Sequence, residues 1–259
     1  MLEFNNQILN KLKECKNNIE HFIPSIKIGD IWRGTNTKNW FEYFDVDWDL
    51  SNLNIYPINR YELLKEISQI KKNGNFDKFK IRELIVKIFA WGGMSKRETT
   101  GKLAMIHIDR YEDVCKNLLK NKLNNISAFK EFYELHNNND KNSSMKGVGP
   151  AFYTKLIYFL GNQEGLIMDQ WTAKSVNLLC NNKIIKLDSG YVSKRNKDND
   201  YIAFINIVKK LQIELAMYSL SETEALIFST SRKVNRTTLN SEQNLIASEW
   251  RNFVIANYK

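Results

Sequence analysis

The residues best suited to chemistry in this sequence are a lone aspartate and a glycine-rich turn upstream of it. Asp169 follows the apolar run 165–168 and should stand at the start of a helix, where an aspartate most often serves as the N-cap. A carboxylate fixed at such a point can also stabilise positive charge on a reacting sugar and orient a water molecule. The sequence at this position therefore fits a structural cap and a catalytic group.

The glycine-rich turn reads Lys146-Gly147-Val148-Gly149-Pro150 and precedes an amphipathic segment. Its two glycines let backbone N–H groups come close to a phosphate, and the start of the following helix adds partial positive charge there. By itself the turn is typical of an ordinary helix cap. The turn and the aspartate together, at their spacing, are more specific than either feature alone.

The stretch 145–176 resembles the helix-hairpin-helix DNA glycosylase superfamily, which combines a Gly-Val-Gly hairpin, a helix and an essential aspartate. Ala151, just after the hairpin, and Asp169 lie eighteen residues apart, which matches the family spacing. Together with Ala90-Trp91-Gly92-Gly93, the stretch looks most like the bacterial branch with an 8-oxoguanine-glycosylase-like fold. The resemblance implies an enzyme that flips a modified base out of DNA and excises it.

The resemblance also implies a role for individual residues. Asp169 would be the essential carboxylate, and the hairpin would dock a DNA phosphate. The implied DNA contacts are Lys146, Gly147, Val148, Gly149 and Lys155, and the implied walls of the base pocket are Trp91, Phe152 and Trp171. Family members can bind a monovalent or divalent cation through backbone carbonyls near the hairpin, which here would belong to Ser143, Met145 and Val148. No other cofactor is expected.

Two positions depart from the family pattern. Members that also cut the strand carry a nucleophilic lysine where this chain has Ala151, so the resemblance implies a monofunctional glycosylase. Lys155, one helical turn further on, is the alternative amine for a bifunctional glycosylase/lyase, although a phosphate contact or a solvated face is the preferred interpretation. Trp171 replaces a histidine of many relatives. A non-catalytic helix-hairpin-helix DNA-binding protein is the third hypothesis.

Hydrophobic periodicity predicts the elements that position these residues. The fold class expected is mainly α: a two-lobe helix-hairpin-helix glycosylase fold with a small mixed N-terminal portion. We expect one glycosylase-like unit over 1–259, with short strands and loops within 1–75 and helical lobes over 76–259 that contain the helix-hairpin-helix at about 140–180. The predicted helices are 4–20, 60–73, 77–90, 110–122, 126–136, 150–161, 201–218, one after Asp169 and one from Ser241.

Composition bounds the partners and the compartment. A formal net charge of +9 and a pI of about 9.3 suit a polyanionic partner such as DNA. The three cysteines form no CxxC pair, which argues against a disulfide framework or a zinc knuckle. No apolar run is long enough for a membrane span and no signal peptide is evident. We expect a monomeric, cytoplasmic, nucleoid-associated bacterial protein.

Other patterns leave alternatives open. Asp45, Asp47 and Asp49 could hold Mg²⁺ in a nuclease, but a solvated acidic loop is the preferred interpretation. The basic run 194–197 is interpreted as plain surface. Oxidised guanine is the substrate that the family suggests. The Asn- and Lys-rich composition suggests an AT-rich gene, which is compatible with a mobile or defence-associated origin. A bulky modified base in phage DNA is therefore the alternative substrate, with DNA repair or anti-phage defence as the role.

Overall fold

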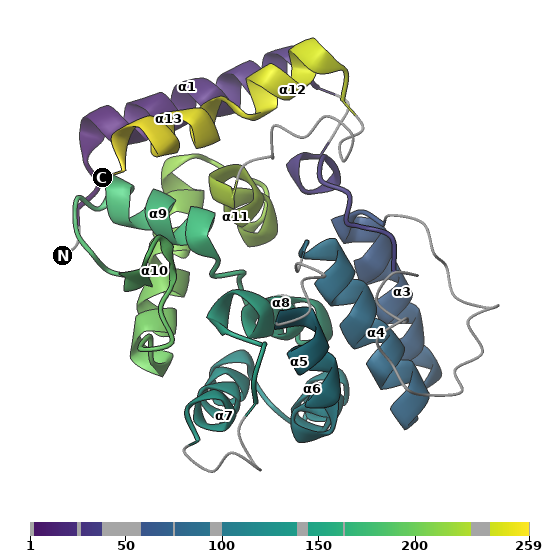
Figure 1. Ribbon diagram of the computed structural model, residues 1–259. Helices are drawn as coiled ribbons and strands as arrows, with labels where there is room; N and C mark the ends of the chain where they lie inside the picture. Colours follow the sequence, from purple (N-terminus) through teal and green to yellow (C-terminus); the bar gives the residue numbers. More distant parts are fainter. Residues whose placement is uncertain are drawn as a thin grey trace. The chain divides into compact units, whose positions relative to one another are not determined.

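The computed structural model describes residues 3–24, 27–37, 58–74, 76–93, 100–138, 145–162, 164–228 and 239–258. These residues are mainly helical, which confirms the predicted fold class. The chain divides into two compact units, one formed by 1–32 with 166–259 and the other by 33–165 (Figure 1). We call them the terminal unit and the central unit. No helix among the described residues is long and apolar enough to cross a membrane.

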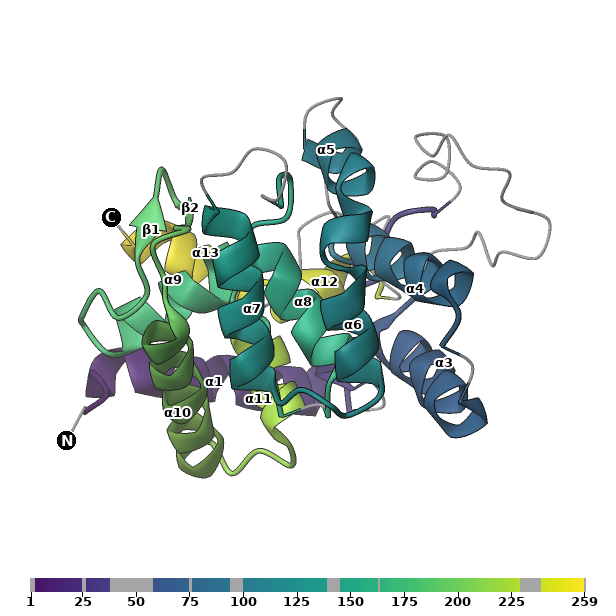
Figure 2. The same ribbon diagram turned by 90° about the horizontal axis from the view of Figure 1, so that it is seen from below.

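The central unit is built around α8, which contacts α3, α4, α6 and α7 (Figure 2). Its elements are α3 (Arg60–Asn73), α4 (Lys78–Trp91), α5 (Thr100–Ile106), η3 (Ile108–Arg110), α6 (Glu112–Leu119), α7 (Asn125–Asn137) and α8 (Pro150–Leu160). From Tyr153 onward every residue of α8 is buried, because apolar side chains lie on all sides of the helix. Tyr153 stacks on Phe132 of α7 with ring centroids 5.5 Å apart.

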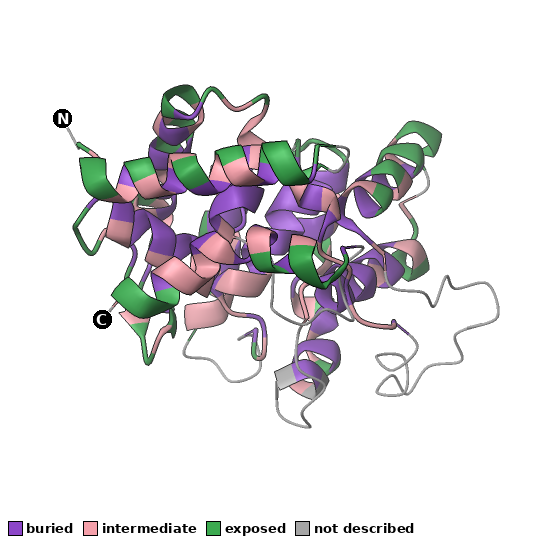
Figure 3. Ribbon diagram, turned by 90° about the horizontal axis from the view of Figure 1, so that it is seen from above, coloured by how far each residue is buried: buried purple, intermediate pink, exposed green. Residues whose placement is uncertain are grey.

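The terminal unit is built around α9, which contacts α1, α10, α11, α13 and β2. Its elements are α1 (Asn6–Phe22), η1 (Ile28–Asp30), α9 (Gln170–Leu179), β1 (Leu187–Asp188), β2 (Tyr191–Val192), α10 (Asp198–Glu214), α11 (Leu220–Phe228), α12 (Ser241–Ala247) and α13 (Glu249–Asn257). The first helix lies beside the last two, α12 and α13 (Figure 1). Figure 3 shows the amphipathic pattern of α1, with exposed and buried residues on opposite sides.

The predicted helices are present, with shifts at their ends. The helix expected over 201–218 is α10, which begins at Asp198 and ends at Glu214. Within 1–75, where short strands and loops were expected, the described residues form α1, η1 and α3, and one isolated bridge joins Arg33 to Asn59. Asp45, Asp47 and Asp49 lie outside the described residues.

The three cysteines are buried and unbridged. Burial raises the pKa of the Cys180 thiol to about 11 and that of Cys15 to about 12, so both stay protonated at neutral pH. These thiols are accordingly part of the core and poor nucleophiles.

A buried ion-pair group in the central unit gives a test of its packing. The Lys87 ammonium lies 2.6 Å from carboxylate oxygens of both Glu66 and Glu83, and Lys87 and Glu83 are buried. Lys87→Met leaves Glu83 with Lys80 as its remaining partner and should lower the free energy of unfolding by about 3 kcal/mol. Chemical denaturation measures this, with Lys72→Met at an exposed position as the control. Equal losses in the two variants would show that the group contributes no specific stability.

Candidate active site

Asp169 is the N-cap of α9, as its sequence position predicted. Its Oδ1 accepts hydrogen bonds from the backbone N–H groups of Trp171 at 2.8 Å and Thr172 at 3.1 Å. Thr172 Oγ1 in turn accepts from the Asp169 N–H, which completes a capping box. The residue is 7% exposed. The two donors and the helix dipole stabilise the negative charge of the carboxylate and fix its position.

The helix that carries Asp169 is itself held from the side by buried hydrogen bonds. Ser175 Oγ donates to the Ile227 carbonyl of α11 at 2.8 Å and accepts from Trp250 Nε1 of α13 at 3.0 Å. All three bonded atoms are buried in the terminal unit. A displacement of α9 would break this chain of bonds, so the Asp169 carboxylate belongs to a rigid part of the fold.

Trp171, two residues after Asp169, is half-buried and lies next to two basic side chains. The Arg251 guanidinium carbon is 3.9 Å from the Trp171 ring centroid, and the Lys174 ammonium is 4.8 Å from it. These are cation–π contacts. Its predicted role as a wall of the base pocket stays a prediction. The Arg251 contact had no sequence signal, because 80 residues separate the two positions.

The predicted hairpin is a tight turn that leads directly into α8. Gly147 has φ of +80°, a conformation that an L side chain rarely adopts. Gly149 is the N-cap and offers no side-chain cap, and Pro150 is the first helical residue. Among the described residues, no acceptor pairs with the Ala151 N–H. A donor left in this position suits an anionic ligand.

The three carbonyls expected to hold a cation fall in different situations. Met145 O lies 3.2 Å from Nδ1 of His136, which leaves room on the oxygen for a second partner. Val148 lies within the turn, between the two glycines, and Ser143 lies outside the described residues. Within the described part of the chain, no group of three His, Cys, Asp or Glu side chains is placed to hold a metal. The hairpin cation stays a prediction.

Lys155 is buried at 3% exposure, so the interpretation as a solvated face is wrong. Its Nζ donates to the Ala151 carbonyl at 2.7 Å and lies 5.1 Å from the Phe152 ring centroid. The side chain turns back toward the start of α8, as long side chains on helices do. The Lys155 amine therefore lies at the first helical turn of α8, beside position 151. Phe152 itself is half-buried and packs edge-on against Phe89.

Gly92 of the Ala90–Gly93 motif lies against the stem of Lys155. A Cβ on Gly92 would lie 2.7 Å from Lys155 Cδ, so the missing side chain makes space for the lysine. Trp91 is 1% exposed and packs edge-on against Phe159 at 4.9 Å between centroids. These contacts account for Trp91 as a core residue of the central unit. Its pocket role also stays a prediction.

The comparisons with known proteins cover the hairpin as well as Asp169. The family model described as "Putative 8-oxoguanine DNA glycosylase OGG-like protein" matches residues 35–228, a range that contains the hairpin, Lys155 and Asp169. No curated protein and no solved structure matches the chain. Because the family match spans most of the sequence, the chain belongs to the OGG-like family that this model describes, a family of DNA glycosylases.

Proposed function

We propose that this protein is a monofunctional DNA glycosylase that hydrolyses the N-glycosidic bond of a modified base with the help of Asp169. The observation that carries the proposal is the fixed Asp169 carboxylate, held by two backbone N–H groups at the start of the central helix of its unit. Its family places the chain among DNA glycosylases. The positive net charge of +9 suits the DNA partner.

The reaction explains why a single carboxylate suffices. The base must first leave the duplex stack, because the bond to be cut is buried there. Its bond to C1′ then breaks, the electron pair leaves with the base, and the base takes up a proton. Positive charge accumulates on the sugar, where a nearby carboxylate stabilises it. Water bonds to C1′ and gives up a proton, for which the carboxylate of Asp169 is an acceptor.

The hairpin supplies a contact to the DNA backbone in this proposal. The turn at 146–149 and the Ala151 N–H face a phosphate, while Lys146 adds positive charge. A cation bound by the carbonyls of Met145 and Val148 would strengthen the same contact. Phosphate contacts position the duplex and carry no base identity, so base choice belongs to the pocket side chains.

The hairpin contact predicts different outcomes at its two glycines. A Cβ on Gly149 would meet no atom within 4 Å, so Gly149→Ala should leave folding unchanged while its methyl group obstructs the phosphate. We expect affinity for any DNA to fall about tenfold, the value of one charge-assisted hydrogen bond. Gly147→Ala should in addition destabilise the fold, because φ is +80° there.

Fluorescence anisotropy on duplexes with different bases measures both effects. The control is Gly74→Ala at the end of α3, where φ is +68° and space is open, so that it introduces strain away from the hairpin. Loss of base preference with unchanged affinity in the Gly149 variant would contradict the assignment of the hairpin to phosphate.

The substrate is proposed from two sources. The family description suggests oxidised guanine, and a DNA repair role follows from it. The Asn- and Lys-rich composition suggests instead a bulky modified base of phage DNA and a role in defence. The decisive experiment is mass spectrometry of bases released from a panel of modified DNAs, including phage genomes. Release of one base identifies the substrate, whereas DNA binding without release from any member would support the non-catalytic hypothesis.

The second candidate function is a bifunctional glycosylase/lyase that uses Lys155. The observation that favours it is the buried amine at 2.7 Å from the Ala151 carbonyl, since burial can make a lysine a better nucleophile. We prefer the monofunctional proposal because position 151 has no amine.

A further inference from the structure

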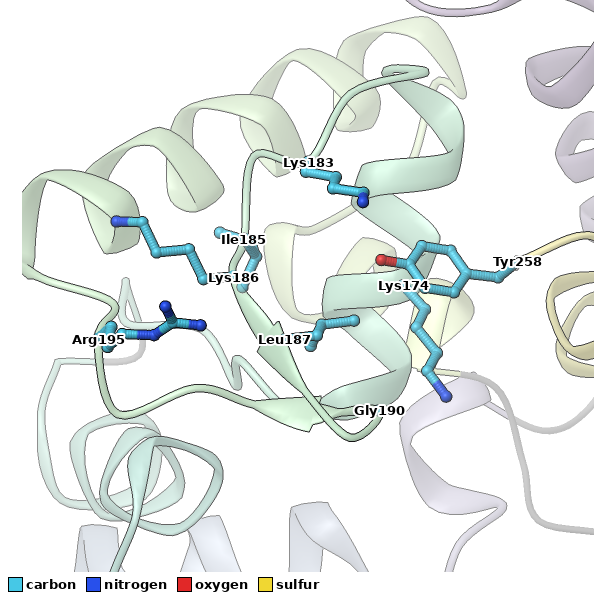
Figure 4. Close-up of a pocket in the computed structure, with 8 residues that line it drawn as sticks. All are labelled: Lys174, Lys183, Ile185, Lys186, Leu187, Gly190, Arg195 and Tyr258. Carbon is cyan, nitrogen blue, oxygen red and sulfur yellow. The ribbon is translucent and has the colours of Figure 1, made fainter.

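A basic depression of about 510 Å³ lies on the terminal unit beside α9 and the β1–β2 hairpin (Figure 4). Half of its eight lining residues are basic: Lys174, Lys183, Lys186 and Arg195. Tyr258, from the end of the chain, lines it as well. Four basic side chains around one depression suit an anionic ligand.

Two buried asparagines hold the loop whose residues line the depression. Asn177 of α9 pairs with Ile185 through both amide atoms, donating to its carbonyl and accepting from its N–H at 2.8 Å each. Asn196 is fully buried and makes the same double contact with Lys186 at 2.9 Å. A loop held at two points by buried amides presents its lysines in a preformed arrangement, which lowers the entropic cost of binding.

The turn between β1 and β2 lies close to one of these cations, Lys174. Ser189 and Gly190 both have positive φ, as a two-residue type I′ turn requires. A Cβ on Gly190 would lie 3.6 Å from the Lys174 ammonium. The glycine therefore serves the turn, and a side chain at this position would be in van der Waals contact with Lys174.

The charges of the depression are only partly balanced. Lys186 pairs with Asp200 at 2.7 Å, and Arg195 pairs with Asp188 at 2.5 Å. Lys174 and Lys183 have no carboxylate partner among the described residues. Two uncompensated positive charges thus remain at one preformed surface.

The aromatic neighbours complete the site. The Lys174 ammonium is 5.9 Å from the ring centroid of Tyr258 and 4.8 Å from that of Trp171. The Tyr258 hydroxyl oxygen accepts from Asn177 at 3.1 Å, so its proton is directed to another acceptor. Basic side chains interleaved with aromatic rings are the combination by which proteins follow a nucleic-acid strand.

We propose that this depression binds backbone phosphates of the DNA strand whose base is excised. The proposal rests on the proposed function, because Asp169 marks the reacting nucleotide. Lys174 lies five residues after Asp169 on the same helix, about 7.5 Å along its axis. Backbone phosphates of one strand advance by about 3.4 Å per nucleotide. The phosphate bound by Lys174 would therefore belong to a nucleotide close to the target, and Lys183 lines the same depression. The run 194–197, interpreted from the sequence as plain surface, contributes Arg195 to this contact.

The test compares the salt dependence of DNA binding in two double variants of the full chain. Lys174→Gln/Lys183→Gln removes the two uncompensated charges of the depression. Lys13→Gln/Lys209→Gln removes two charges from α1 and α10 of the same unit and is the control. We expect the slope of log K against log salt to fall by about 2 in the first variant, with affinity about tenfold weaker per lost contact at 0.1 M salt. The control should stay near the wild-type slope.

Further measurements separate the possible failures. Thermal unfolding and the single variant Lys183→Glu, at an exposed position, distinguish a lost contact from a damaged fold. Equal slopes in the two double variants would overturn the proposal. NMR measures whether inorganic phosphate changes the chemical shifts of the backbone amides of 183–197. Such changes, combined with a salt dependence of DNA binding that is unchanged in Lys174→Gln/Lys183→Gln, would assign the depression to a free anion and also overturn the proposal. If slopes differ as expected but no base is released from any DNA, the proposed function fails and the phosphate site stands.

Discussion

Replacing Asp169 with asparagine should abolish base release while leaving DNA affinity near that of the wild type. Asparagine keeps the hydrogen bonds to the N–H groups of Trp171 and Thr172, because Asn is as good an N-cap as Asp. The fold should therefore be preserved, and the loss is that of one negative charge. We expect the single-turnover rate of base release to fall by at least about 100-fold, as when a group that stabilises transition-state charge is removed.

The structure supplies a matched control for this experiment. Asp77 is the N-cap of α4 and accepts from the Lys80 N–H at 2.8 Å, so Asp77→Asn makes the same chemical change at another helix start. It should leave base release unchanged. Asp169→Ala adds the loss of the cap, which costs about 1 kcal/mol of stability. Full activity of Asp169→Asn would remove the basis of the proposed mechanism and leave Asp169 as a structural cap.

Borohydride should trap little or no covalent enzyme–DNA adduct, and the reaction should leave an abasic strand uncut. Trapping reduces an imine. A neutral amine attacks C1′ and the base departs with its electron pair; the C1′–O4′ bond then breaks, O4′ takes up a proton, and the nitrogen forms the C=N bond. Ala151 has no amine, and the Lys155 ammonium is engaged by the Ala151 carbonyl at 2.7 Å. The reaction is run with a DNA from which the enzyme releases a base and is then treated with borohydride. Gel electrophoresis measures the covalent adduct.

Two lysine variants show whether Lys155 is the amine that forms any trapped adduct. Lys155→Met keeps the apolar stem that packs at Gly92 but has no amine. Lys71→Met removes another lysine that donates to a backbone carbonyl, that of Gly161, and is the control. Strong trapping that disappears in Lys155→Met and persists in Lys71→Met would establish the lyase. Trapping that survives Lys155→Met would point to a different amine, such as the N-terminus, and would leave the argument for Asp169 intact.

The sequence by itself determined the features that depend on local chemistry. The apolar periodicity, the capping residues and the turn at Gly147 each follow from contacts within a few residues, so the helices and the N-cap role of Asp169 could be predicted. The family resemblance came from the same short stretch, and the family match over 35–228 confirmed it. The basic composition likewise indicated the kind of partner but not where it binds.

Tertiary structure alone decided which side chains face water and which distant residues meet. Lys155 looked solvated because lysine usually is, but Gly92, the C-cap of α4 and 63 residues earlier, leaves the space in which its stem is buried. Residues 1–32 join 166–259 in one unit through packing of the first helix on the last two, a long-range contact without local signature. The basic depression exists because Asn177 and Asn196 hold a charged loop in one shape. A loop sequence gives the charges, whereas the buried amides that fix their positions come from elements folded against it.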